Sequence, residues 1–321
     1  MEQRRLGQGG FEVSALGYGA GAVGGLMVRG SAAEQERSLA RAFAAGITYV
    51  DTAALYGDGE SERNLGRALK ALGARPLLGT KVRLPPESRG DIAGAIARSL
   101  EASLARLGHD SVDLLQLHDP IGTPAGLSLA QVMEEAVPAL RRLQAEGKCR
   151  RLGITALGEA GALRAVLQSG AFDTAQIPCN LLNPSWLAPR RPGLPGQDFT
   201  GLGAVAVGAG IGLIGIRILA GGALSGEEER HPVAMPEVAP IASGPDYAAD
   251  LAAARRLRPL VAEGVAGSLA ELAIRYAAFL PGMGCALIGT ASLEQLEAAI
   301  AAVERGPLPP EALARIDALL A

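Results

Sequence analysis

Residues 46–62 read GITYVDTAALYGDGESE and indicate a buried strand that ends in an acid and is followed by a phenol. The run 47–50 is apolar or β-branched without alternation, which is typical of a strand covered on both faces. Asp51 stands where that strand ends, and Tyr56 lies in the glycine-rich turn before a helix that begins near Glu62. Parallel barrels carry their chemistry at the carboxyl ends of strands, so the acid and the phenol are candidate catalytic residues.

Eight short apolar runs occur along the chain, and most are followed by an amphipathic helix pattern. The expected strands are 15–20, 47–50, 77–80, 112–117, 151–154, 174–178, 212–216 and 286–288. Strands that alternate with helices pair in parallel through right-handed crossovers. Eight such units in 321 residues fit an α/β fold of the (β/α)8 TIM barrel type better than an open sheet. We therefore expect a single barrel domain over residues 1–321.

Additional segments surround these units. Gly9 and Gly10, between short apolar flanks in residues 4–13, predict an N-terminal β-hairpin that could close the bottom of the barrel. The connections after strands 4, 6 and 7 are too long to be simple turns, and such loops are often functional. They are residues 119–127, 180–200 and 219–247. The second connection contains four prolines and Trp186, which favours a lid of defined conformation over a flexible linker.

The composition argues against several partners. The net charge of −3, with mixed signs throughout, predicts neither a nucleic acid nor a membrane as partner. The apolar runs are too short for a membrane span, and the first residues lack the apolar segment of a secretory signal, so we expect a cytoplasmic protein. Neither the three cysteines nor the three histidines have metal-ligand spacing, which predicts structural thiols and no metal site. Nothing in the sequence indicates an oligomeric state.

Polar side chains stand at or just after the ends of the second to seventh predicted strands. They are Asp51, Lys81, His118, Thr155, Gln176, Asn180 and Arg217. In a barrel these side chains converge on one mouth. Each alone could simply mark the end of the apolar core, but an amine, an acid and an imidazole gathered at low dielectric need partners. The set as a whole therefore indicates a catalytic site.

Several segments, together spanning nearly the whole chain, resemble the aldo-keto reductase superfamily. Residues 51–62 are similar to its signature, Lys81 has a matching position at a strand end, residues 112–118 (VDLLQLH) match a third motif, and residues 138–148 are similar to the family's fourth helix. The resemblance implies an NAD(P)-dependent oxidoreductase that transfers a hydride between a nicotinamide and a carbonyl or alcohol. The catalytic tetrad that it implies is Asp51, Tyr56, Lys81 and His118.

The chemistry of such a tetrad follows from electrostatics. Hydride transfer to a carbonyl leaves charge on oxygen, and a free tyrosine, with a pKa of about 10, is too weak an acid near neutrality. An ammonium at about 4 Å contributes roughly 4 kcal/mol at an effective dielectric of about 20, which favours the phenolate. We therefore expect Lys81 to activate Tyr56 as general acid/base and Asp51 to keep Lys81 protonated. A neutral His118 would orient the carbonyl.

The resemblance also assigns residues to the cofactor. They are Thr155, Gln176, Arg217, Gly289, Ser292 and Gln295. Gln176 would hold the nicotinamide amide, Arg217 replaces a common stacking aromatic, and Ser292 would cap the last barrel helix near the phosphate end. Ala156 lacks the carboxamide usual after Thr155. Ala291 and Ala299 replace an arginine and an asparagine at the adenosine end, which favours NAD over NADP because a bidentate phosphate contact is lost.

Alternatives to this interpretation stay open. Residues 19–24 fit the pattern GxGxxG after a strand, but Asp51 lies further away than the roughly 20 residues expected in a dinucleotide-binding sheet. A nicotinamide-binding sensor or accessory subunit on the same barrel would not require Tyr56. Among enzymes, His118-Asp119-Pro120 is similar to the branch that oxidises aldoses with NAD. The expected substrate is a small carbonyl compound or sugar, and the direction of the reaction is left open.

Overall fold

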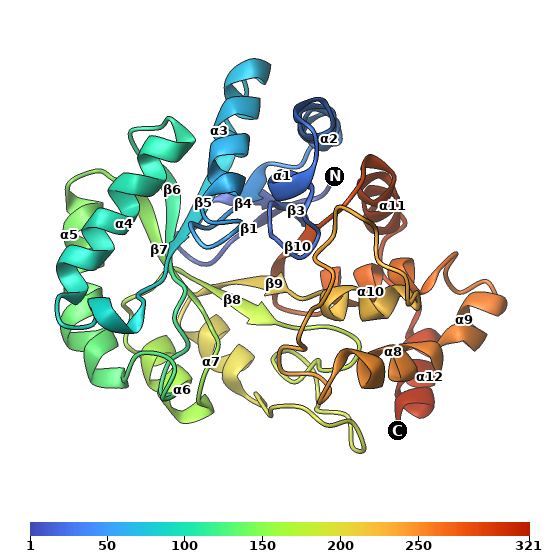
Figure 1. Ribbon diagram of the computed structural model, residues 1–321. Helices are drawn as coiled ribbons and strands as arrows, with labels where there is room; N and C mark the ends of the chain where they lie inside the picture. Colours follow the sequence, from blue (N-terminus) through green and yellow to red (C-terminus); the bar gives the residue numbers. More distant parts are fainter.

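The computed structural model describes all 321 residues, and its centre is a closed barrel of eight parallel strands (Figure 1). The strands are β3 (Leu16–Gly19), β4 (Tyr49–Asp51), β5 (Leu77–Val82), β6 (Val112–Leu117), β7 (Cys149–Thr155), β8 (Thr174–Pro178), β9 (Gly212–Ile216) and β10 (Met283–Gly289). Each strand pairs with the next, and β10 closes the barrel against β3. The predicted (β/α)8 barrel is confirmed, and the open dinucleotide-binding sheet is ruled out.

Helices surround the barrel and connect its strands (Figure 1). The helices of the ring are α2 (Ala32–Ala44), α3 (Glu60–Leu72), α4 (Ile92–Leu107), α5 (Val137–Ala145), α6 (Ala160–Gln168), α7 (Leu202–Gly208), α10 (Leu269–Ala278) and α11 (Leu293–Glu304). The remaining elements are α1 (Leu26–Arg29), α8 (Tyr247–Arg255), α9 (Arg258–Ala262), α12 (Pro310–Leu320), the 3-10 segments η1 (Pro86–Ser88) and η3 (Ala220–Ser225), and the π-helical segment η2 (Gln131–Ala136) that precedes α5. The side chain of Ser292 caps α11, as predicted, by accepting from the Gln295 backbone N–H. No helix has both the length and the apolar character needed to cross a membrane.

The hairpin predicted near the N-terminus is confirmed and closes the floor of the barrel. Strands β1 (Gln3–Arg5) and β2 (Glu12–Ser14) pair antiparallel. Leu6 and Val13 are fully buried in a cluster with side chains from inside the barrel, Ile214 among them. Leu6 also lies against Gly212, which begins β9. The hairpin therefore covers the amino ends of the strands and leaves the opposite mouth for the site.

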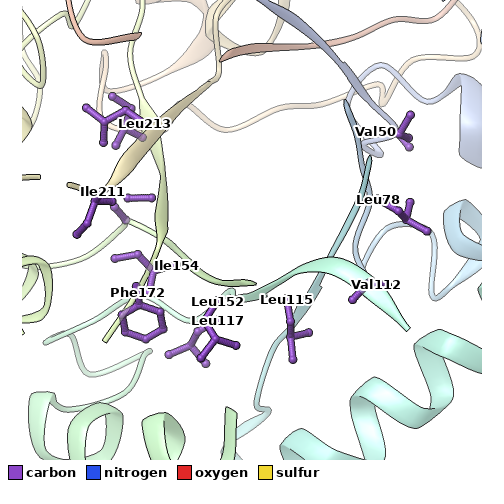
Figure 2. Packing of buried hydrophobic residues seen from close by; sticks show 14 of the residues in the cluster. Val50, Leu78, Val112, Leu115, Leu117, Leu152, Ile154, Phe172, Ile211 and Leu213 are labelled. Carbon is purple, nitrogen blue, oxygen red and sulfur yellow. The ribbon is translucent and has the colours of Figure 1, made fainter. Parts of the chain in front are cut away.

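Alternation along each strand separates two environments. In β6, Leu115 and Leu117 belong to the main core between strands and helices, and Figure 2 shows both on the side of the strands that faces the helices. Leu114, on the other face, packs inside the barrel. Gln116 shares that inner face, so a polar group enters the barrel at this level.

The three long connections follow strand carboxyl ends, as predicted. In the connection 180–200, Trp186 is buried in the main core and stacks on Phe199 at 5.1 Å between ring centroids. This connection is thus a packed part of the protein. The cysteines, at positions 149, 179 and 285, are unpaired and buried, and burial raises the pKa of each thiol to about 12. They are inert thiols at neutral pH.

Candidate active site

Lys81 lies at the centre of the polar cluster in the barrel mouth. Its Nζ donates to Asp51 Oδ2 at 2.5 Å, to the Thr52 carbonyl oxygen at 2.8 Å and to Tyr56 Oη at 3.1 Å. Only 1 % of the residue is exposed. Burial acts to lower the pKa of this amine, but the charges of Asp51 and Tyr56 outweigh it and raise the pKa above its ordinary value. The amine is therefore an ammonium.

Tyr56 reaches this ammonium from the turn between β4 and α3. The turn needs residues in the left-handed region, and Gly57 supplies one at φ 62°. A side chain at this glycine would also collide with Val28, since a Cβ would lie 2.4 Å from its Cγ1. Tyr56 is half-buried, and the Lys81 Nζ is 4.7 Å from the centre of its ring. The hydroxyl thus faces a cation while part of the ring faces the mouth.

His118 completes the predicted tetrad. It follows β6, where its backbone N–H donates to the Val82 carbonyl oxygen at 2.8 Å. Its ring meets Tyr56 edge-on, with centroids 6.0 Å apart and planes at 89°. Burial, followed by the positive charges of Lys81 and Arg83, lowers the pKa of His118 to about 3. The imidazole is neutral near pH 7, and its buried Nδ1 has no hydrogen-bond partner. The four residues of the predicted tetrad therefore lie together.

Asp51 accepts hydrogen bonds from more residues than the sequence suggested. Besides Lys81 on Oδ2, its Oδ1 accepts from Tyr49 Oη at 3.0 Å, Gln116 Nε2 at 3.0 Å and Gln176 Nε2 at 2.6 Å. Gln176, expected to hold a nicotinamide amide, thus directs its NH2 group toward the Asp51 carboxylate. The sequence analysis missed Tyr49 and Gln116. The signal that could have found them is alternation, because each lies two residues before a tetrad residue on the same strand face.

At the end of β9, the expected polar residue Arg217 does not simply continue the strand into the mouth. Ile216 packs against the cluster inside the barrel, while the next residue, Arg217, turns into the left-handed region at φ 57°. Asn180 Nδ2 donates to the Arg217 carbonyl oxygen at 2.9 Å, and the Arg217 guanidinium donates to the Ala239 carbonyl oxygen at 3.3 Å. Burial lowers the pKa of Arg217, with a smaller opposing effect of Tyr56. Arg217 forms no ion pair with a carboxylate.

The predicted phosphate-end residues gather at the start of α11. Gly289 ends β10 and is exposed. Ser292 Oγ accepts from the Gln295 backbone N–H at 3.3 Å, and Gln295 Oε1 accepts from the Ala291 N–H at 2.8 Å. The two side chains thus complete the N-terminus of the helix. Gly24 packs closely on this turn, because a Cβ there would lie 2.6 Å from the Thr290 nitrogen.

The mouth contains buried polar atoms that have no hydrogen-bond partner within the protein. Thr155 is buried at the end of β7, and its hydroxyl has no partner within the protein. His118 Nδ1 is likewise unpartnered. At Gly21 a Cβ would meet only the Tyr56 ring, at 4.0 Å, so the first βα loop leaves space above the phenol. Atoms without partners also occur elsewhere, as at Trp186 Nε1, but Thr155 and His118 differ in standing at strand carboxyl ends in the mouth. In that position their polar atoms are compatible with a nicotinamide cofactor.

Comparisons with known proteins agree with this geometry. The model of the Aldo/keto reductase family matches residues 15–321. The L-galactose dehydrogenase of Arabidopsis thaliana is 31 % identical over an alignment that covers all of this chain and 94 % of that protein. The D-threo-aldose 1-dehydrogenase of a Pseudomonas species is 34 % identical over 50 % of this chain and 55 % of that protein.

Solved structures have the same barrel. A holo-form aldo-keto reductase of Bacillus halodurans superposes with a TM-score of 0.74 at 25 % identity, covering 100 % of this chain and 97 % of that one. For an aldo-keto reductase of Klebsiella pneumoniae in complex with NADPH, the TM-score is 0.70 at 24 % identity, over 100 % and 96 % of the chains. This second likeness concerns the fold alone. The family match over nearly the whole chain decides the assignment: the chain belongs to the aldo/keto reductase family and is a nicotinamide-dependent oxidoreductase.

Proposed function

We propose that the protein exchanges a hydride between NAD(H) and the carbonyl or alcohol carbon of an aldose or related aldehyde, with Tyr56 as the general acid/base. The observation that carries this proposal is the buried Lys81 ammonium, which touches both Asp51 Oδ2 and Tyr56 Oη. The bound nicotinamide supplies or accepts the hydride. The residues of the chain transfer the proton and stabilise the negative charge that develops on the substrate oxygen.

In the reducing direction, Tyr56 gives its phenolic proton to the carbonyl oxygen as the carbon gains the hydride. The phenolate left behind is stabilised by Lys81 Nζ at 3.1 Å. Asp51 keeps this amine charged and in place. His118, a neutral ring facing the phenol edge-on, donates a hydrogen bond to the same oxygen. Oxidation of an alcohol follows the reverse course, with the phenolate taking the proton.

The cofactor would be held by residues around this centre. Gln176 uses its NH2 group on Asp51, which leaves its carbonyl oxygen to accept from the nicotinamide amide. The unpartnered Thr155 hydroxyl stands on the neighbouring strand, paired in register with Gln176. Arg217, a half-buried cation without a carboxylate, would meet an anionic part of the cofactor. Gly289, Ser292 and Gln295 would lie beneath its phosphate end.

The start of α11 favours NAD over NADP. Ala291 and Ala299 are buried and offer no charge to an additional phosphate. Glu294 is exposed in the first turn of this helix, and hydrogen bonds from its own backbone and from Ser292, followed by smaller effects of His231 and Arg37, lower its pKa. A carboxylate here repels a 2′-phosphate. The aldose preference rests on the similarity to L-galactose dehydrogenase and D-threo-aldose 1-dehydrogenase.

The test of Tyr56 is the substitution Tyr56→Phe. We expect kcat to fall by about 10²–10⁴, the range for loss of a general acid, while the Kd for NADH measured by fluorescence stays within about twofold. Wild-type turnover in this variant would refute the proposed role. Turnover absent in both proteins despite NADH binding would instead favour a cofactor-binding sensor.

The cofactor and substrate assignments need a second experiment. Initial rates should be measured with NAD and NADP in both directions on a panel of aldoses and simple aldehydes. We expect kcat/KM for NAD to exceed that for NADP by at least about tenfold, equivalent to about 1.4 kcal/mol. An NADP preference of that size would contradict the argument from Glu294 and Ala291.

A further inference from the structure

The Asp51 carboxylate rests on a polar layer inside the barrel. Tyr49 and Gln116, from β4 and β6, both donate to its Oδ1 at 3.0 Å. Tyr49 is 1 % exposed and Gln116 is fully buried. Their donor groups reach Asp51, which separates them from Tyr56 and the open mouth. Burying polar side chains in an otherwise apolar interior is costly without partners. The carboxylate supplies a partner for the Tyr49 hydroxyl and the Gln116 Nε2 group, while Gln116 Oε1 has none.

Two glycines make the space for this layer. A Cβ on Gly79 would lie 2.4 Å from the Tyr49 hydroxyl, and a Cβ on Gly153 would lie 2.4 Å from the Thr174 hydroxyl and 3.0 Å from Gln116 Cγ. Neither glycine has a positive φ, so backbone conformation does not demand them. Their role is to admit the polar side chains. The interior therefore leaves room at Gly79 for Tyr49, and at Gly153 for Thr174 and Gln116.

We propose that Tyr49 and Gln116 are positioning residues for the reaction. They hold Asp51 through Oδ1, so that Oδ2 is directed at Lys81. The Lys81 ammonium then keeps enough of its positive charge to stabilise the Tyr56 phenolate. This inference rests on the proposed role of Tyr56 as general acid/base. Hydrogen bonds to one oxygen of a carboxylate withdraw negative charge from the other. Without them, Oδ2 would neutralise the Lys81 charge more completely, and the Tyr56 phenolate would be less stable.

Tyr49 is suited to this task because it remains a donor. Burial, followed by the negative charge of Asp51, raises the pKa of Tyr49 well above its usual value. The hydroxyl therefore keeps its proton over the working pH range. The other titratable groups that face the carboxylate are Lys81 and Cys285 of β10, and the pKa of this thiol is raised by burial and then by the charge of Asp51. Beyond Lys81 lies Tyr56, which in turn faces Arg217 and His118.

The test compares two buried tyrosines on adjacent strands. Tyr49→Phe removes a donor to Asp51, whereas Tyr18→Phe removes a hydroxyl that contacts only Ser38 Oγ, at 3.1 Å. We expect Tyr49→Phe to move the midpoint of the pH profile of kcat for alcohol oxidation upward by about one unit. The rate below that midpoint should fall about tenfold because less phenolate is present. Tyr18→Phe should leave the midpoint unchanged, and the Kd for NADH should stay within about twofold in both.

A second variant and a second readout keep the inference falsifiable. Gln116→Met removes a second of the three side-chain donors to Oδ1 at similar volume, with Gln176 left in place, and should move the midpoint in the same direction, whether or not Tyr49→Phe folds. The midpoint can also be read without turnover from tyrosinate absorbance, as the difference between each protein and its Tyr56→Phe counterpart. Wild-type midpoints in Tyr49→Phe and Gln116→Met, or an equal shift in Tyr18→Phe, would overturn the positioning role. An active Tyr56→Phe enzyme would instead overturn the proposed function.

Discussion

His118 shows how position in the barrel sets the chemistry of a single side chain. Burial and the nearby charges of Lys81 and Arg83 lower its pKa to about 3. A protonated imidazole would place a further cation beside the Lys81 ammonium in a buried site, which is unfavourable. A neutral ring can donate a hydrogen bond to a carbonyl oxygen without that cost. The same side chain exposed on the surface would titrate near pH 6.5.

This shift predicts a loss of stability in acid. Below about pH 6.5 the unfolded chain binds a proton at His118 that the folded protein, with a pKa of about 3, does not bind. Stability is therefore lost progressively as the pH falls from about 6.5 toward 3. Urea unfolding at pH 7 and pH 5 should show a smaller acid loss for His118→Gln than for wild type. His231→Gln, at an exposed histidine, is the control. Equal acid losses in all three proteins would contradict the prediction.

Helix α3 is anchored to the barrel by a buried carboxylate. Glu62 is fully buried in the first turn of the helix and accepts from Thr80 Oγ1 at 2.5 Å and from Arg106 Nε at 2.7 Å. These contacts join α3 to β5 and to α4. Because the turn that holds Tyr56 leads directly into α3, the anchor also positions the phenol.

Removing this carboxylate should destabilise the protein strongly. Glu62→Ala removes the carboxylate that pairs with Arg106, and breaking one side of a fully buried pair costs about 3–5 kcal/mol. Because the Arg106 side chain is 22 % exposed and keeps its bond to Ser103, we expect a loss near the lower end of this range. The matched control is Glu60→Ala in the same turn, where the pair with Arg63 is exposed and worth about 0–1 kcal/mol. Urea denaturation gives both free energies of unfolding. A loss for Glu62→Ala no larger than that for Glu60→Ala would show that α3 does not depend on this anchor.

The barrel as a whole depends on closure at its floor. Leu6, from the loop of the N-terminal hairpin, is fully buried and packs with residues of the interior cluster. The floor lies at the end of the barrel opposite the site. Packing there supports the fold, whereas the mouth supports the chemistry.

We expect Leu6→Ala to separate stability from activity. A buried leucine truncated to alanine costs about 2–5 kcal/mol. Thermal unfolding should therefore begin at a lower temperature, while kcat/KM per folded molecule, measured well below that temperature, stays within about twofold of wild type. Leu313→Ala, at an exposed leucine of α12, should change neither quantity. A large fall in kcat/KM for Leu6→Ala would mean that the floor shapes the mouth.

Local patterns in the chain were sufficient for the architecture, and the tetrad was predicted from these patterns together with the resemblance to the aldo-keto reductase superfamily. Apolar strands alternating with amphipathic helices specify parallel pairing, because a strand buried on both faces and a helix with one apolar face have few other ways to pack. Asp51, Lys81 and His118 could be found because each stands where an apolar strand ends. Tyr56 was found from the motif around it. The cap at Ser292 was also predictable, since a cap depends on residues within one turn.

Contacts between distant strands were decided only by the tertiary structure. Gln116 looks like an ordinary strand residue, and its role depends on β6 meeting Asp51, which lies 65 positions earlier in the chain. The contact between Tyr49 and Asp51 is local, since both residues belong to β4. The inward position of Ile216 beside the turned Arg217 depends on a backbone conformation that Asn180 holds from the preceding strand end. Conformational preferences of the sequence act over a few residues. Hydrogen bonds inside a barrel depend instead on the register between strands, and that register is fixed only when the barrel closes.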